Sequence, residues 1–366
     1  MNTEDPSPDP RARRRLDRRG VIAALLASPG LLLPHRSAAL PAGGPRPWHH
    51  TDDGFRNPPG SPVRQAERSD WNTFFRQMRA VRKEEVALPE DFRLSEEEAL
   101  AGIRALGDRD GITWLGHAAF LIRLGGVTFL TDPYLSPYAS PVPPFGPKRF
   151  TPPGITVERL PPVDVLMLSH NHYDHMDLWT IEKLRDRERM TAVVPLGLAG
   201  YPKNRRIHDV RAMDWHTRTD VRGVRVTAVP AIHASQRWLW DRNRTLWTGY
   251  VLEANGRRIY FAGDTGYGPV FADTGRRYGP FDVGLVPIGA YEPRLLMEAV
   301  HTTPEEAIRL GSDMRCRSLI GMHWGAIRLT PEPVLAPKAR LQAAAEAAGY
   351  APGDVTCLRL GETRAL

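Results

Sequence analysis

The chain has 366 residues, of which 42% are hydrophobic and 25% are charged. This balance is ordinary for a globular protein and argues against a disordered or fibrous chain. No run of 18 or more apolar residues occurs, which argues against a membrane-spanning helix. The two cysteines, Cys316 and Cys357, are too few for a disulfide framework.

The formal net charge of +7 is unevenly distributed. The first 42 residues hold seven arginines and four acidic residues, so this segment alone carries +3. The remaining chain has only a mild basic excess, which is weak support for nucleic-acid binding. We therefore expect no nucleic acid among the partners.

Residues 1–42 have the order of segments found in an export signal. An arginine-rich stretch ends in Arg18-Arg19, an apolar run follows over 21–33, and small residues come next in 37–42. Paired arginines favour the twin-arginine route, which predicts an exported, periplasmic protein. A disordered basic tail or an uncleaved membrane anchor is the alternative.

Residues 43–110 are predicted to form a linker and an ordered lead-in that contains helices. The lead-in includes Phe55-Arg-Asn-Pro58, and the pattern predicts helices at about 68–84 and 94–106. The second of these helices has acidic residues in its first turn, as helix N-termini favour. A second region, residues 111–366, changes to short β segments with turns and is expected to form the main domain.

Two predicted hairpins divide the main domain. The first joins strands 118–124 and 127–131 through Gly125-Gly126, and the second joins strands 250–254 and 257–261 through Asn255-Gly256. An aspartate follows each hairpin, Asp132 in the first case and Asp264 in the second. This repetition indicates an internal duplication, with two similar sheet units packed face to face.

The other predicted elements alternate between strand and helix. They are an apolar run at 163–168, a helix at about 178–189, strands near 191–195, 224–229 and 283–288, a helix at 304–311, a strand at 318–322, a helix at 337–348 and a closing strand near 355–360. Strands that alternate with helices, together with hairpins, favour an α/β fold with helices outside two sheets.

The strongest chemical signal follows the apolar run that ends at Ser169. Four potential metal ligands fall within six residues: His170, His172, Asp174 and His175. Imidazole and carboxylate donors together suit zinc and its neighbours. The sequence therefore predicts a metal site on the loop that follows this strand.

Three further candidate ligands each follow an apolar strand, where loops carry function. They are His233, Asp264 and His323. With these, two metal sites can be completed. The predicted sets are His170, His172 and His233 for one metal, Asp174, His175 and His323 for the other, and Asp264 as the bridge between them.

Two residues are candidates for supporting roles around the metals. His117 begins a predicted strand and could line the floor of the site without binding metal. Asp132 could accept the free N–H of a ligand histidine. His301, by contrast, is interpreted as an ordinary polar residue.

These residues resemble the metallo-β-lactamase superfamily, whose His-x-His-x-Asp-His motif residues 170–175 reproduce. The resemblance covers about residues 112–366. It implies an α/β architecture, the four-layer αβ/βα sandwich, with the metals at one edge of the two sheets. It also implies two Zn2+ ions, and Mn2+ or Fe2+ can occupy the same kind of donors.

A narrower resemblance, over residues 49–366, is to N-acylphosphatidylethanolamine-hydrolysing phospholipase D. The family's ligand set matches the one predicted above. One departure concerns the substrate: the family carries a Gln-Tyr pair before Gly146, and Pro143-Pro144 stands there in this chain. The resemblance is carried by short motifs at 146–150, 160–164, 169–175, 194–198, 261–267, 287–294, 304–307 and 322–325.

The resemblance implies hydrolysis of a phosphodiester, of the phospholipase D type, with a phospholipid as the substrate. A hydroxide held between the metals would attack phosphorus, because zinc lowers the pKa of bound water to about 7. Asp264 and Asp174 are the predicted catalytic residues. Arg294 is a candidate for orienting an anionic substrate, with a surface salt bridge as the alternative.

Aromatic residues follow His233 and precede the metal loop. They are expected to form an apolar channel for acyl chains or a surface for peripheral membrane contact, and packing within large loops is the alternative. Other activities compatible with the ligands are hydrolysis of lactones or other cyclic esters and amides, nuclease activity, and metal binding without catalysis. The aromatic residues are Trp238, Trp240, Trp247, Tyr134, Tyr138 and Phe145.

Overall fold

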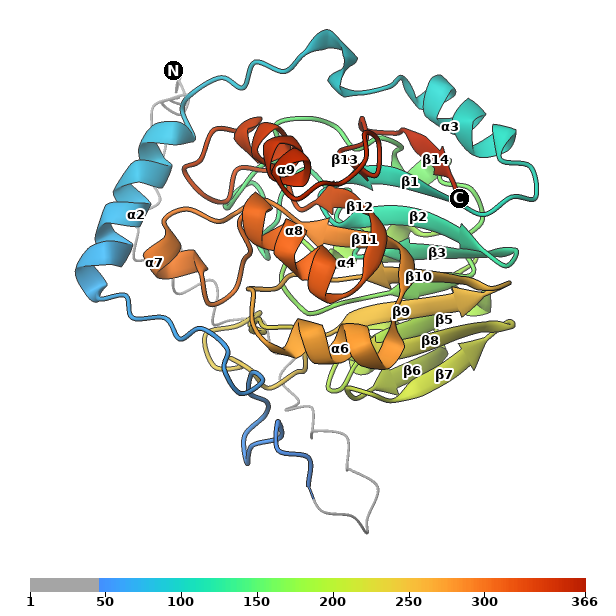
Figure 1. The fold of residues 1–366 in the computed structure, drawn as a ribbon, viewed down its shortest axis with the longest axis horizontal. Coiled ribbons are helices and arrows are strands. Elements are labelled where there is room, and N and C mark those ends of the chain that lie inside the picture. Colours follow the sequence, from blue (N-terminus) through green and yellow to red (C-terminus); the bar gives the residue numbers. More distant parts are fainter. Residues whose placement is uncertain (1–45) are drawn as a thin grey trace, which may run out of the picture. The chain divides into compact units, whose positions relative to one another are not determined.

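The structure, a computed structural model, describes residues 46–366 (Figure 1). The export signal predicted for residues 1–42 lies outside the described residues. Within the described part of the chain, no helix is both long and apolar enough to span a bilayer.

Two mixed sheets of seven strands each form the centre of the fold. The first sheet consists, in spatial order, of β14 (Thr363–Ala365), β1 (Gly111–Gly116), β2 (Ala119–Leu124), β3 (Val127–Thr131), β4 (Val165–Met167), β5 (Thr191–Pro195) and β6 (Asp209–Met213). The second consists of β13 (Val355–Thr356), β12 (Cys316–Met322), β11 (Phe281–Pro287), β10 (Arg257–Phe261), β9 (Gly249–Ala254), β8 (Val224–Val229) and β7 (Arg218–Val221).

The two sheets repeat one pattern of strand pairing. In each, an antiparallel trio, β1-β2-β3 or β8-β9-β10, continues into three parallel strands. The remaining strands are exchanged: β7, which follows the first repeat, pairs with β8, and β14, which follows the second, pairs with β1. The topology therefore has the duplication that the two hairpins indicate.

Helices cover the outer faces of the sheets. In Figure 1 helices α6, α8 and α9 lie over the second sheet, where α8 contacts β11 and β12. The helices are α2 (Arg68–Val81), α3 (Glu96–Ala105), α4 (Leu178–Lys183), α5 (Gly200–Lys203), α6 (Val270–Tyr278), α7 (Arg294–Met297), α8 (Pro304–Asp313) and α9 (Ala336–Ala347), with 3-10 turns at Glu90–Phe92, Val157–Arg159 and Arg187–Arg189.

Alternation along the strands divides the hydrophobic core into two layers. Phe120 and Ile122 of β2 pack with Phe261 of the second sheet in the layer between the sheets. Leu121, between them in sequence, faces the other way and packs with Ile181 of α4. Because successive side chains of a strand point to opposite faces, one strand serves both layers.

The structure corrects several predicted boundaries. The helix expected at 178–189 ends at Lys183, because Leu184 is extended and Asp186 takes a left-handed φ of 54° before a short 3-10 turn. The closing strand expected at 355–360 is only Val355–Thr356. Strands β1, β6, β7 and β14 and helices α5, α6 and α7 were not predicted. Of these, β6 and β7 are mostly exposed and lack a clear apolar pattern.

The packing of α6 against the end of α8 leads to a testable prediction. A Cβ atom on Gly275 would lie 2.0 Å from the Asp313 carbonyl oxygen. Alanine favours a helix over glycine by about 1 kcal/mol, but overpacking against backbone costs about 1–3 kcal/mol. We expect Gly275→Ala to lower the denaturation midpoint. Arg276→Ala, at an exposed position of the same helix, should leave the midpoint nearly unchanged, and a Gly275→Ala variant of full stability would contradict the packing.

Candidate metal centre

The predicted ligands gather at the edge where strands of both sheets end. His170 follows β4, His233 follows β8, Asp264 follows β10 and His323 directly follows β12. These strands run in the same direction within their own sheet, so their carboxyl ends and the loops that follow share one edge. The fold therefore converts positions far apart in sequence into one cluster.

The first group of donors consists of three histidines. Nε2 of His170 lies 2.9 Å from Nδ1 of His172, which lies 3.3 Å from Nε2 of His233. One nitrogen from each ring lies within 4.8 Å of the others. Nitrogen atoms each about 2.0–2.1 Å from one zinc ion would have separations of this size.

The second group is built around Asp174. Its Oδ2 atom lies 3.6 Å from Nε2 of His175 and 3.6 Å from Nε2 of His323. His117 joins this group, with Nε2 2.9 Å from the same oxygen. The four side chains satisfy the same distance criterion as the first group, so His117 is near enough to hold Asp174 or to serve as a further ligand.

Asp264 lies between the two groups. Its Oδ2 atom is 3.0 Å from Nε2 of both His175 and His323. The same atom is 3.9 Å from Nε2 of His170 and 3.8 Å from Nε2 of His233. A single carboxylate oxygen thus faces both groups, as the predicted bridging role requires.

Unsatisfied polar atoms indicate that a cation fits here. Nε2 of His175 and His323 and Oδ1 of Asp264 are buried and have no hydrogen-bond partner among the described residues. Buried polar groups are almost always hydrogen-bonded or bound to an ion. Unpartnered imidazole nitrogens around one carboxylate are therefore better explained by metal ligation than by a hydrogen-bond network.

Burial and the two carboxylates determine the pKa values of the candidate ligand histidines. Burial lowers the pKa of His233 to about 3 and holds the pKa of His170 well below its usual value. Burial opposes protonation of His323 as well, but the carboxylates of Asp264 and Asp174 outweigh it and raise the pKa to about 9. The first group is thus held as neutral imidazole, whereas in the second group the two carboxylates favour a proton on His323 and burial lowers the pKa of His117 to about 3.

Outer hydrogen bonds fix the orientation of three ligand rings. Nδ1 of His175 donates to Asp132 Oδ2 at 2.8 Å, and Nδ1 of His233 donates to the carbonyl oxygen of Val300 at 2.8 Å. Ser169 Oγ donates to Asp132 and lies 2.9 Å from Nδ1 of His170. These contacts place the proton on Nδ1 and leave Nε2 free for a metal.

Three residues at the site have left-handed backbone conformations. The φ angles are 57° for His117, 31° for Asp132 and 61° for His323. Such conformations are uncommon for side chains other than glycine and gather at functional sites, where the surroundings hold them. The strain therefore coincides with the residues that bind or orient ligands.

Two residues outside the predicted ligand set lie at the site, and one of them is His301, which the sequence analysis interpreted as an ordinary polar residue. His301 stacks on His323, and its buried Nδ1 lies 4.0 Å from Asp264 Oδ2 without a hydrogen-bond partner. Arg237 is buried and donates to the carbonyl oxygens of Asn171 and Met176, one within the metal loop and one at its end. No apolar strand precedes either residue, so strand-end reasoning could not find them.

The side chain of Arg294, a candidate for orienting the substrate, is held by contacts within the chain. Its guanidinium makes two hydrogen bonds to Glu306, of 3.0 and 2.9 Å, and one to the carbonyl oxygen of His301. These contacts commit the charge to an ion pair, which was the alternative interpretation. Arg294 therefore supports the segment that carries His301, and its role in orienting a substrate stays a prediction.

The aromatic residues divide into two classes. Tyr134 and Trp247 are buried, which agrees with packing, while Trp238, Trp240 and Phe145 are exposed. The rings of Trp238 and Trp240 stack with centroids 5.8 Å apart. Their loop also contains Arg237, so the exposed indoles lie on a segment anchored to the metal loop.

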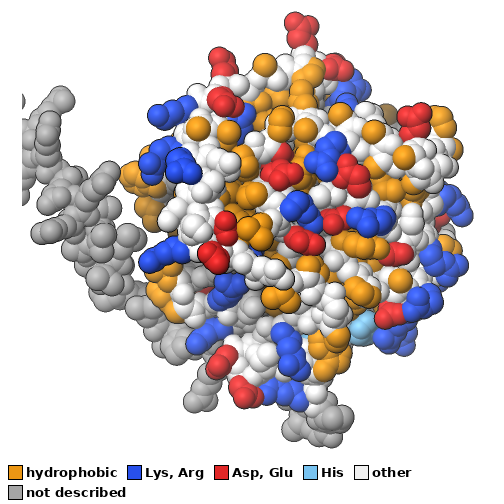
Figure 2. Space-filling model, turned by 60° about the vertical axis from the view of Figure 1, so that its left-hand side comes forward, with side chains coloured by type: hydrophobic (Ala, Val, Ile, Leu, Met, Phe, Trp, Pro, Cys, Tyr) orange, Lys and Arg blue, Asp and Glu red, His pale blue; other side chains and the backbone are white. Residues whose placement is uncertain are grey.

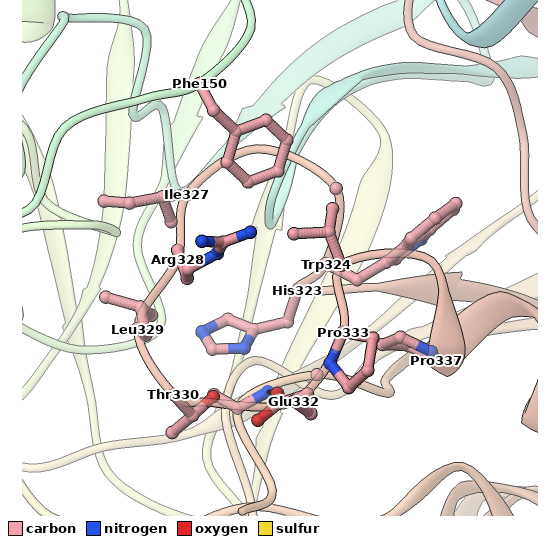
Figure 3. Close-up of a pocket in the computed structure, with 14 residues that line it drawn as sticks. Phe150, His323, Trp324, Ile327, Arg328, Leu329, Thr330, Glu332, Pro333 and Pro337 are labelled. Atoms are coloured by element: carbon pink, nitrogen blue, oxygen red, sulfur yellow. Dashed lines mark hydrogen bonds between the residues drawn. The ribbon is translucent and has the colours of Figure 1, made fainter. Parts of the chain in front are cut away.

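A small cavity adjoins the second ligand group (Figure 3). Phe150 and Ile327 line one part, and His323 points between Arg328 and Glu332. Burial raises the pKa of Glu332, and one of its oxygens accepts a hydrogen bond from the backbone of Ala290. The cavity therefore places both polar and apolar side chains next to the second ligand group, on the side of His323.

Asp132 offers a direct test of the outer hydrogen bonds. Asp132→Asn should weaken metal binding at the second ligand group by about 10–100-fold, the usual cost of losing such a partner. The measurement is a zinc titration against a competing chelator. Asp108→Asn, at a fully exposed side chain, is the control, and equal affinities for the two variants would refute the role of Asp132.

Known proteins resemble this chain in sequence and in fold. A family model described as a beta-lactamase superfamily domain matches residues 128–324. N-acyl-phosphatidylethanolamine-hydrolyzing phospholipase D 1 of Caenorhabditis elegans is 39% identical over 242 residues, which cover 63% of this chain and 68% of that protein.

The mitochondrial enzyme of the same name from Saccharomyces cerevisiae is 31% identical over 293 residues, which cover 76% of this chain and 62% of that protein. Among solved structures, isothiocyanate hydrolase from Delia radicum gut bacteria superposes with a TM-score of 0.56 at 20% identity, over 70% of this chain and 99% of that one. The chain therefore belongs to the beta-lactamase superfamily and has the metallo-β-lactamase fold of metal-dependent hydrolases.

Proposed function

We propose that this protein is a binuclear metal-dependent phosphodiesterase of the phospholipase D type, acting on lipids similar to N-acylphosphatidylethanolamine. The observation that carries the proposal is the position of Asp264 Oδ2 between two groups of donors. The names of the worm and yeast relatives support the substrate class.

Two zinc ions are the proposed cofactors, held by the two predicted ligand sets, and Mn2+ or Fe2+ would suit the same donors. When bound, such ions supply an acidified water for attack and positive charge for phosphoryl oxygens. Asp264 holds the two positions together, and Asp132 and Ser169 keep the imidazoles of the metal loop in orientation.

His301 is the proposed residue for contact with the substrate at the centre. Burial holds the pKa of His301 well below its usual value, so its ring is neutral. A neutral imidazole can donate one hydrogen bond to a phosphoryl oxygen and accept another. Arg294 and Glu306 keep this segment in place through the carbonyl oxygen of His301.

Exposed apolar side chains near the metal loop support a lipid substrate. Trp238 and Trp240 are 46% and 60% exposed, and Leu239 between them is 92% exposed. Exposed apolar groups of this size beside a site are typical of surfaces that bind lipid or protein. We therefore include peripheral membrane contact in the proposal.

The face of the molecule in Figure 2 gives no support to a nucleic-acid substrate. On the face shown in Figure 2, acidic and basic side chains are interspersed, with hydrophobic side chains between them. Nucleic-acid binding needs a concentrated basic surface. Export by the twin-arginine route remains a proposal that rests on residues 1–42.

The proposed reaction can be tested with purified, zinc-loaded protein and four substrates. These are N-acylphosphatidylethanolamine, bis-p-nitrophenyl phosphate, an acyl lactone and nitrocefin. We expect turnover of the first two, and at least a 100-fold loss in His172→Ala because a ligand of the first group is removed. His208→Ala, at an exposed histidine away from the centre, should behave as wild type. Turnover of the lactone alone would contradict the proposed phosphodiesterase activity.

The membrane contact has its own test. Replacing both Trp238 and Trp240 by serine should reduce turnover of lipid in vesicles several-fold and leave turnover of soluble bis-p-nitrophenyl phosphate unchanged. The physical reason is the loss of two exposed apolar rings that would enter the interface. Vesicle sedimentation measures the binding directly. Equal losses on both substrates would instead indicate damage to the metal centre.

A further inference from the structure

We propose that the N-terminal strap, residues 47–61, helps to position a ligand of the metal centre. Within it, Asn57 is a positioning residue for the ligand His233, and His49, His50 and Asp214 form a clasp that anchors the strap. The inference rests on the proposed function in one respect, since it takes His233 as a metal ligand.

Asn57 holds the backbone of His233 on both sides. Its Nδ2 atom donates to the His233 carbonyl oxygen at 2.9 Å, and its Oδ1 atom accepts the His233 backbone N–H at 3.0 Å. The same oxygen accepts a hydrogen bond from Trp247 Nε1 at 2.9 Å. One side-chain amide therefore satisfies the full backbone of the ligand residue, as a paired strand would.

The opposite side of this loop is held by the residues that follow Asp264. Thr265 Oγ1 accepts the backbone N–H of Ile232, and Gly266 donates its N–H to the carbonyl oxygen of Ile232. The segment that presents His233 thus lies between the strap and the bridging aspartate. Removing the Asn57 side chain would take away one of the two supports of the segment that presents His233.

The clasp fixes the beginning of the strap to the loop after β6. Nε2 of His49 lies 2.7 Å from one oxygen of Asp214, and Nε2 of His50 lies 2.8 Å from the other oxygen. Both imidazoles are buried, and His49 also stacks on Trp215 with ring centroids 4.5 Å apart. The two rings thereby satisfy both oxygens of the carboxylate.

Packing connects the clasp to Asn57. Phe55 lies against the cluster that contains Trp215 and Trp247, and Trp215 Nε1 donates to the carbonyl oxygen of Trp247. Gly54 lets the strap turn close to the chain, because a Cβ atom there would lie 2.0 Å from the carbonyl oxygen of Asn243. The strap is therefore held at two points, with a tight turn between them.

The distances within the clasp are those of direct hydrogen bonds and not those expected of a third metal site. Separations of 2.7 and 2.8 Å between ring nitrogen and carboxylate oxygen are those of direct, charge-assisted hydrogen bonds. Each Nε2 faces a different oxygen, so the three side chains already satisfy one another. At the metal centre, in contrast, nitrogen faces nitrogen and several atoms have no partner.

The test follows metal binding in Asn57→Ala. We expect one of two metal equivalents, the one at His170, His172 and His233, to bind about 10–100-fold more weakly. Chelator competition with Zn2+ measures the affinity, and the visible absorption of the Co2+-loaded protein reports the ligand geometry. A purely structural role would not weaken one equivalent selectively.

Two further variants make the test decisive. His49→Ala/His50→Ala opens the clasp without touching the centre and should shift the same equivalent in the same direction by a smaller factor, so it serves if Asn57→Ala does not fold. Asp52→Asn, at an exposed side chain of the same strap, should match wild type.

The possible results separate cleanly. Wild-type affinity and an unchanged Co2+ spectrum in Asn57→Ala would overturn the positioning role. A third metal equivalent that disappears when the clasp is opened would overturn the clasp. A wild-type protein that binds no metal at all would refute the proposed function, and the inference with it.

Discussion

The seven candidate ligands, five histidines and two aspartates, converge on a largely buried volume, and this convergence constrains the rest of the molecule. Buried polar groups without partners are costly, and buried charges more so. At Asp264, two imidazole nitrogens approach one carboxylate oxygen to 3.0 Å without forming hydrogen bonds. Such an arrangement persists only where the surrounding structure holds each group against relaxation, and cations would remove the cost.

The support comes in successive layers around the centre. Asp132 orients His175 and, through Ser169, His170. Arg237 holds the metal loop by backbone carbonyls at two points. Each contact restrains a ligand without occupying its metal-facing atom. Asn57 of the lead-in extends this support to His233 from outside the main domain.

The sequence allowed prediction of the parts of the centre that are local or follow a simple rule. The cluster at 170–175 is visible because its donors are adjacent, and His233, Asp264 and His323 because each follows an apolar strand. His301, Arg237 and Asn57 could not be found in this way. Their roles depend on contacts between residues that lie 37, 66 and 176 positions apart in the chain, and no local pattern marks such partners.

The same distinction applies to the fold. Both hairpins and most of the buried strands were predicted, because apolar patterns and turn residues are local signals, but the buried strand β1 was not. The helix predicted at 178–189 was too long because the backbone leaves the helical conformation at Leu184, and Asp186 then turns into a left-handed conformation. Strands β6 and β7 are exposed and polar, and pairing with neighbours defines them. Of the two interpretations open for Arg294, the ion pair could not be assigned to a partner from the sequence, because Glu306 lies in a different helix.

The exchanged edge strands have a consequence for how the chain acquires its structure. Strand β14 closes the first sheet by pairing with β1, although some 250 residues separate them in sequence. The first repeat therefore cannot complete its hydrogen bonding while only that half has been synthesised. Loop closure over such a distance is slow compared with local hairpin formation. The two repeats, similar as they are, must mature together, and the edge of β1 stays open to wrong partners until the last strand arrives.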